Sequence, residues 1–126
     1  MSEVEVFRFE VTQDMRDYLE LIDTKYAEAK KKRLSRFSLE WGKWSAEMNR
    51  ETRPKCEAGD DQSIGYKYIF LYWTLMSQLL ELHHKHKFTR QAYKREIAKT
   101  AKLVKRGVLA GKAPDPGGMP ELRGKL

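Results

Sequence analysis

Residues 64–86 read IGYKYIFLYWTLMSQLLELHHKH, and this stretch decides the fold. Placed on a helix, its aromatic and aliphatic residues point in most directions. The polar side chains mark only a narrow edge, formed by Lys67, Thr74, Gln78, Glu81 and Lys85. A helix that is apolar on most faces lies at the centre of its fold or in an interface. In a chain of 126 residues, which is the size of one domain, this predicts a central helix around which the other elements pack.

The same stretch is too short to cross a membrane. Its uncharged part, residues 68–80, has 13 residues, whereas a spanning helix needs about 20. The acidic N-terminus does not resemble a secretory signal, which has a basic start followed by an apolar core. A single cysteine, Cys56, excludes an intramolecular disulfide framework and fits a reducing compartment. We therefore expect no membrane contact and a cytoplasmic, nucleoid-associated or nuclear location.

Two apolar series precede the central helix at intervals of three or four residues, which is typical of helical faces. The first contains Met15, Leu19, Ile22, Tyr26 and Ala29, and the second contains Leu34, Phe37, Trp41, Trp44 and Met48. They fit either one helix over residues 14–51 or two helices with a break near Ser35 or Ser38, and we prefer two. Residues 52–63 contain Pro, Gly and paired Asp, which predicts a connector.

A basic helix is predicted over residues 89–107. Thr89 suits its N-cap, Phe88 and Tyr93 suit a hydrophobic staple, and Gly107 suits its end. One apolar stripe runs along this helix through Tyr93, Ile97, Ala101, Val104 and Val108. The remaining faces hold seven cations, namely Arg90, Lys94, Arg95, Lys99, Lys102, Lys105 and Arg106.

The N-terminal residues 3–12, EVEVFRFEVT, alternate as a short strand does. No second strand is recognisable downstream, so the backbone groups of this strand must pair with another copy or partner, or pack as an extended arm. Residues 113–126 form a Pro- and Gly-rich tail. We predict one all-α domain over residues 1–112, a small bundle of three to four helices with an N-terminal extended strand or arm over residues 1–12.

The net charge of +7 is unevenly distributed along the chain. Residues 1–24 hold seven acids and two bases, a balance of −5. Residues 25–36 hold six bases and one acid, a balance of +5, and residues 84–112 hold ten bases and one acid, a balance of +9. Such asymmetry is informative about partners rather than about the fold.

The two basic segments predict contact with nucleic acid, either DNA or RNA, or with a nucleoprotein complex. Lysines and arginines along a helix neutralise phosphates and release counterions, which makes binding salt-dependent. The short turn at residues 85–88 suits a helix-turn-helix pair, in which the start of the second helix meets base edges. The residues predicted to bind are the seven cations of the basic helix together with Lys31, Lys32 and Arg33. An acidic protein surface is the other partner that this charge fits, and a merely solvated basic face is the simplest interpretation.

A second hypothesis is a protein-interaction adaptor or inhibitor. Its strand would add to the sheet of a partner or of a second copy, giving a homodimer, through Val4, Val6, Phe7 and Phe9. In this hypothesis the aromatic helix is an alternative contact, since it would fill a groove on a partner. The aromatic residues at helical spacing are more typical of a core than of base-stacking platforms; if an exposed strip for stacking exists, Tyr68 and Tyr72, four residues apart, are the first place to seek it.

The sequence carries no recognisable catalytic motif. It has no glycine-rich phosphate loop, no His-Glu-x-x-His and no glycine-flanked nucleophilic serine, so we expect no enzyme and no cofactor. His83, His84 and His86 form the only histidine group, but Lys85 and Lys87 beside them would repel a metal cation. We expect these histidines to flank the end of the central helix, where a protonated imidazole suits the helix dipole, and we expect no metal site.

Overall fold

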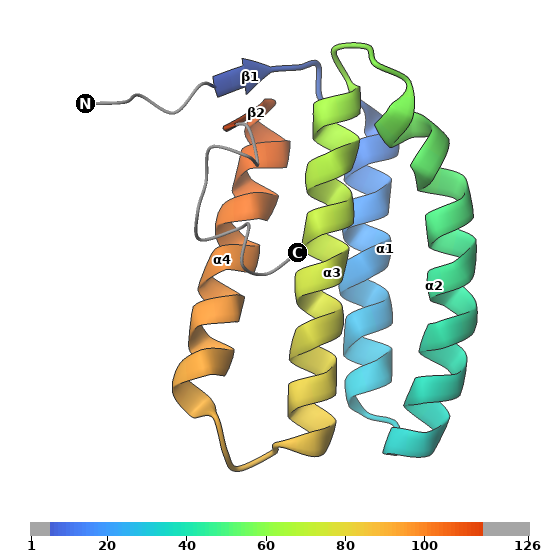
Figure 1. Cartoon of the computed structure of the whole chain (residues 1–126), viewed down its shortest axis with the longest axis vertical. Coiled ribbons are helices and arrows are strands. Elements are labelled where there is room, and N and C mark those ends of the chain that lie inside the picture. The colour runs from blue at the N-terminus through green and yellow to red at the C-terminus, as the bar shows by residue number, and fades with distance from the viewer. Residues whose placement is uncertain (1–5, 115–126) are drawn as a thin grey trace.

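Four antiparallel helices and one short two-stranded ribbon make up the protein (Figure 1). The computed structural model describes residues 6–114, without the side chains of residues 6, 7, 34–38, 113 and 114. This architecture confirms the prediction of a small all-α bundle. In chain order the elements are β1 (Val6–Arg8), α1 (Gln13–Lys30), α2 (Leu34–Glu57), α3 (Ser63–Lys85), α4 (Gln91–Ala110) and β2 (Lys112–Pro114).

Helix α3 packs against all three other helices, with α4 on one side of it and α1 and α2 on the other (Figure 1). Its fully buried side chains include Tyr68, Ile69, Leu75 and Leu80. The covering helices contribute one apolar face each, and the core residues from them include Met15, Leu19, Ile22, Met48, Ile97 and Val108. Burying each large aliphatic side chain stabilises the fold by about 1.5–3 kcal/mol. Covering α3 is therefore the main source of stability.

Tyr68 and Tyr72 do not line an exposed strip, so the stacking alternative fails at these positions and the interpretation of the aromatic residues as core holds there. Both rings are buried in the core around α3. The hydroxyl of Tyr72 donates a hydrogen bond to Asp23 of α1, so the polar end of the side chain has a partner at the edge of the core. A tyrosine ring can be buried with little loss of free energy when its hydroxyl has a hydrogen-bond partner. The presence of a hydroxyl therefore does not show that a tyrosine lies at the surface.

The first two helices differ from their predicted ends. The break between them lies at Lys31–Arg33, not near Ser35 or Ser38. Helix α2 also continues through Pro54 to Glu57, so the predicted connector at residues 52–57 is wrong. Proline removes one backbone hydrogen bond from a helix, but packing holds this last turn in place. Thr52 is fully buried and donates from Oγ1 to the Met48 carbonyl at 2.7 Å.

Both ends of α4 also differ from prediction. The N-cap is Arg90, not Thr89, and its backbone has a φ of 55° with no side-chain cap bond. The predicted staple does not form, because Phe88 is 85% exposed. The helix passes Gly107 and ends at Ala110, since Val108 is buried and Gly111 takes the left-handed conformation with a φ of 67°.

The N-terminal extended segment pairs within the chain. Val6, Phe7 and Arg8 lie opposite Pro114, Ala113 and Lys112 in an antiparallel ribbon. The expectation that no second strand follows is therefore wrong; β2 is only three residues long and its sequence has no strand-like alternation. Its position comes from Gly111, whose carbonyl accepts from Phe9 N at 2.9 Å. Residues 1–5 of the predicted arm and residues 115–126 of the predicted tail lie outside the described residues.

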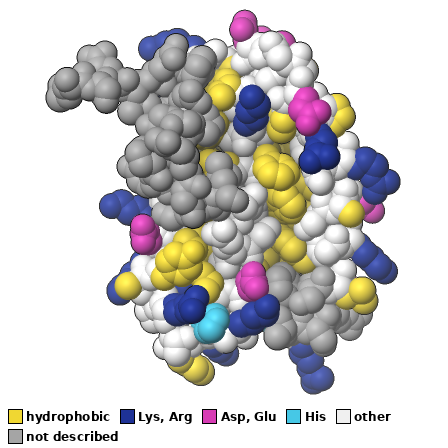
Figure 2. All heavy atoms as spheres, in the orientation of Figure 1, with side chains coloured by type: hydrophobic (Ala, Val, Ile, Leu, Met, Phe, Trp, Pro, Cys, Tyr) yellow, Lys and Arg dark blue, Asp and Glu magenta, His cyan; other side chains and the backbone are white. Residues whose placement is uncertain are grey.

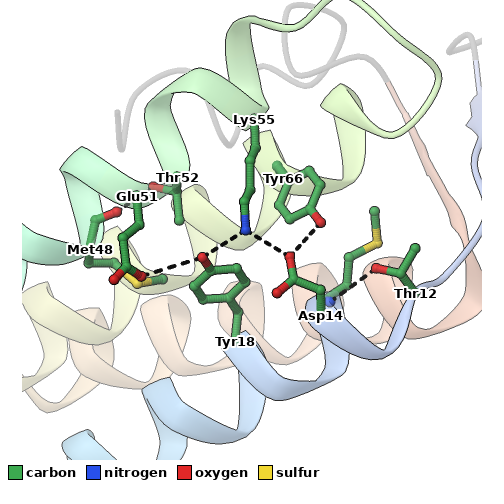
Figure 3. Close-up of polar contacts among 9 residues, drawn as sticks. Thr12, Asp14, Tyr18, Met48, Glu51, Thr52, Lys55 and Tyr66 are labelled. Atoms are coloured by element: carbon green, nitrogen blue, oxygen red, sulfur yellow. Dashed lines mark hydrogen bonds and ion pairs between the residues drawn. The ribbon is translucent and has the colours of Figure 1, made fainter.

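Lys55 of α2 connects three helices through polar contacts (Figure 3). Its Nζ donates to Asp14 Oδ2 of α1 at 2.9 Å and to the Tyr18 hydroxyl at 3.0 Å. The hydroxyl of Tyr66, from α3, donates to the same Asp14 oxygen at 2.6 Å. Burial alone would raise the pKa of the Asp14 carboxyl, but the hydrogen bonds from Tyr66 and Lys55 outweigh it, and the pKa is lowered.

We expect Gly111→Ala to lower the free energy of unfolding by about 2 kcal/mol. An added Cβ would lie 2.6 Å from the Phe9 carbonyl oxygen, and the positive φ strains any residue other than glycine. Gly42→Ala is the matched control, because a Cβ there meets nothing within 4 Å and alanine favours a helix interior by about 1 kcal/mol. Urea unfolding measures both. Equal stabilities of the two variants would contradict the assigned role of Gly111.

We expect Asp14→Asn to lower the free energy of unfolding at neutral pH by about 1 kcal/mol, a modest value because the Asp14 side chain is 48% exposed. Since the pKa of Asp14 is lowered by folding, its contribution is present above the unfolded-state pKa and is lost as the pH falls through the lowered pKa. The difference between variant and wild type should therefore shrink in acid. Asp61→Asn, at an exposed loop carboxylate, is the control and should change little.

Candidate nucleic-acid interface

The fold brings the two basic segments to the same end of the bundle. The chain reverses direction at each turn, so the turn after α1 and the turn before α4 both lie at the lower end in Figure 1. Residues 29–37 contain five cations and no acid, and residues 83–95 also contain five cations and no acid. Figure 2 shows Lys and Arg side chains beside a histidine near this end. The lower end is therefore strongly positive.

A stripe of cations continues from this end along α4. Arg95, Lys99, Lys102 and Arg106 follow one another at intervals of four, three and four residues, which places them on one face. All four are exposed, whereas the buried face of α4 consists of Ile97, Ala101, Val104 and Val108. No carboxylate of the described residues pairs with any of the four cations. We call these four residues the α4 stripe; it is about 16 Å long at the helical rise.

Three of the cations predicted to bind nucleic acid have partners within the protein. Lys105 Nζ lies 2.5 Å from Asp23 Oδ2 of α1, and Lys32 pairs with Glu40 of α2. Lys94 donates to the carbonyls of His86 and Lys87, at the C-terminal end of α3. A cation in that position satisfies carbonyls that the helix leaves free. Their charges are thus partly compensated inside the molecule.

The other predicted cations outside the stripe, Lys31, Arg33 and Arg90, are exposed at the lower end. The prediction of a helix-turn-helix pair is nevertheless wrong. Helices α3 and α4 lie side by side and antiparallel (Figure 1), whereas the helices of that motif cross at about 90–120°. Lys94 bonds the start of α4 to the C-terminal end of α3. The part of α4 that can contact a partner is therefore its solvent-exposed face.

A pocket of about 300 Å³ opens between α1, α3 and α4 at the basic end. None of the residues lining it is acidic: they are Tyr26, Lys30, Leu79, His83, Lys87, Gln91, Lys94, Arg95 and Ala98. Burial lowers the pKa of His83, and the nearby charges of His84, Lys30 and Lys87 lower it further. The pocket could not be predicted from the sequence, because Lys30 and His83 lie on different helices and no local pattern links them.

The residues predicted to bind a partner protein are placed differently. Phe9 is buried, and its ring lies close enough to Gly65 that a Cβ there would be 2.8 Å from it. The prediction that Phe9 contacts a partner is therefore wrong, because the ring fills the gap above Gly65. Val6 and Phe7 lie in β1, which is paired with β2 on one edge, and Val4 lies outside the described residues.

Cys56 lines a more apolar groove of about 330 Å³ between α2 and α3, together with Phe70 and Leu71. Burial raises the pKa of its thiol, which keeps it protonated and unreactive at neutral pH. Over residues 6–114, no group of three or more His, Cys, Asp and Glu side chains is arranged to hold a metal. Nor is any helix in this part of the chain long and apolar enough to span a membrane.

Comparisons of the chain with protein-family models, with curated proteins and with solved structures found no match.

We expect Lys105→Met to lower the free energy of unfolding by about 0.5–1 kcal/mol, because it removes the amine that pairs with Asp23 and keeps the aliphatic stem. Arg106→Met, one residue along, removes an exposed charge of the α4 stripe and should change stability by less than about 0.5 kcal/mol. Urea unfolding compares them. The division into structural and exposed cations fails if Arg106→Met is the more destabilising variant.

Proposed function

We propose that this protein is a small non-enzymatic nucleic-acid-binding protein that contacts the phosphate backbone through α4 and the basic end of the bundle. The observation that carries the proposal is the α4 stripe. It consists of four exposed cations on one helix face that have no carboxylate partner among the described residues. A row of this kind presents its charges at regular intervals to a polyanion, while the buried face keeps the helix fixed to the bundle.

The arrangement favours backbone contact over reading of base sequence. Long cationic side chains reach phosphates in many registers, and phosphate contacts carry no direct sequence information. Helix α4 also packs side by side with α3 (Figure 1), so its exposed face, rather than its end, is the surface that it presents. We therefore expect affinity for duplex DNA that depends little on sequence and strongly on salt.

The test is binding of duplex and of single-stranded DNA over a range of salt concentrations. Four phosphate contacts predict a slope of log K against log salt of about −3.6 for a duplex and about −2.8 for a single strand. Additional contacts from Lys31, Arg33 or Arg90 would make the slope steeper. The double variant Lys99→Glu and Lys102→Glu removes two contacts, so its duplex slope should be shallower by about 1.8 and its binding weaker at every salt concentration.

The matched control is Lys43→Glu with Arg50→Glu. Both residues are exposed and lie seven residues apart on α2. The two substitutions change the net charge by the same amount as Lys99→Glu with Lys102→Glu does. The control should bind nearly as the wild type does. Equal weakening by the two double variants would show that only total charge matters, and absence of binding by the wild type at low salt would overturn the proposed function.

A further inference from the structure

We propose that the pocket between α1, α3 and α4 receives one phosphate group of the bound nucleic acid, and that His83 takes up a proton from water as this phosphate enters. The inference rests on the function proposed above and names a specific site within it. No covalent bond forms or breaks; the imidazole changes from its neutral form to the imidazolium.

The pocket collects cations from three separate elements. Lys30 comes from the last turn of α1, Lys87 from the turn after α3, and Arg95 from the first turn and a half of α4. None of the three pairs with a carboxylate of the described residues, so each has its charge available. The volume of about 300 Å³ is ample for a phosphate group and the sugar atoms attached to it.

Arg95 belongs both to the pocket lining and to the α4 stripe. A strand that follows the stripe toward the basic end therefore reaches the mouth of the pocket without changing direction. This continuity is why we assign the pocket to a backbone phosphate. The pocket on the other side of α3, lined by His86, Lys85 and Arg90, also contains the carboxylate of Glu81 and fits an anion less well.

No acidic side chain lines the pocket around His83. Lys30 lies toward it from α1 beside the ring of Tyr26, His84 is its neighbour on α3, Lys87 is on the turn, and Lys94 and Arg95 are on α4. Burial and this surplus of positive charge lower the pKa of His83, although a hydrogen bond with the Lys30 backbone acts in the opposite direction. A phosphate in the pocket would compensate the cations and favour the imidazolium.

Binding and protonation are then linked. Each unit by which a bound phosphate raises the pKa of His83 makes binding up to about tenfold tighter at a pH below both pKa values than at a pH above them. The experiment uses duplex DNA without terminal phosphates, because a phosphate monoester titrates near pH 6 itself, whereas internal phosphodiesters keep a constant charge. Affinity is measured at about pH 5.5 and about pH 8 at one salt concentration.

The expected result is that the wild type binds more tightly at the lower pH, by up to about tenfold. His83→Gln should lose most of this gain. His86→Gln, whose side chain lines the other pocket, is the matched control and should keep it. An equal gain in wild type and His83→Gln would overturn the assignment of the proton to His83.

A second measurement requires no variant. The pKa of the His83 imidazole in the full-length wild type is followed by NMR in three samples: free protein, protein with sulfate as an anion of constant charge, and protein with the duplex. We expect the pKa to rise by about one unit with the duplex and to rise less with sulfate. If the His83 pKa is unchanged while DNA binding is salt-dependent, the assignment of the pocket as a phosphate site is overturned and the proposed function is left intact.

Failure of the proposed function gives a different pattern. In that case neither duplex nor single-stranded DNA binds at low salt. The claim that the phosphate in the pocket belongs to a nucleic acid is then overturned as well. The sulfate sample then decides the chemistry of the pocket. A raised His83 pKa would support an anion site for another source of phosphate, and an unchanged one would overturn the site entirely.

Discussion

The structure depends on the need to cover α3. A helix that carries large apolar side chains on nearly every side cannot remain against water on any of them, so it requires neighbours around most of its circumference. Helices α1, α2 and α4 meet this requirement with one apolar face each, and their other faces are left to solvent. The exposed face of α4 is available for cations because only one side of that helix is needed for packing.

Polar contacts then fix how the covering helices sit against α3. Two carboxylates of α1, Asp14 and Asp23, each bind a tyrosine hydroxyl of α3 and a lysine of another helix. The tyrosine rings are in the core and their hydroxyls reach its edge, so each contact joins the apolar interior to an ion pair near the surface. Apolar burial supplies most of the stability, and these bonds select one register among the packings that burial alone would allow.

The fold class and the central helix could be predicted because helical periodicity is a strong local signal over twenty or more residues. The ends of elements could not, because local preferences were overruled by packing at a distance. Pro54 suggested a connector, but α2 continues through it to Glu57, and Thr52, two residues earlier, is buried in the core. Gly107 suggested a helix end, but Gly111 takes that role because its carbonyl meets the chain that enters α1.

The basic residues of the site could be found from charge alone, but not their individual roles. Lys105 is 82 residues from Asp23 in sequence, and only the fold shows that this lysine belongs to an ion pair while Lys102 and Arg106 remain exposed. The pocket around His83 was equally hidden, since its lining comes from α1, α3 and α4 and only the fold brings these segments together.

The ribbon of β1 and β2 has a consequence for how the molecule could be handled. Val6 lies opposite Pro114, so the described chain is nearly a closed ring, with its junction at the end of the bundle opposite the basic turns (Figure 1). A circular permutant that joined these two positions and opened the chain at the loop between α2 and α3 would keep every helix pairing. A surface tether at the same junction would hold the protein with its positive end outward.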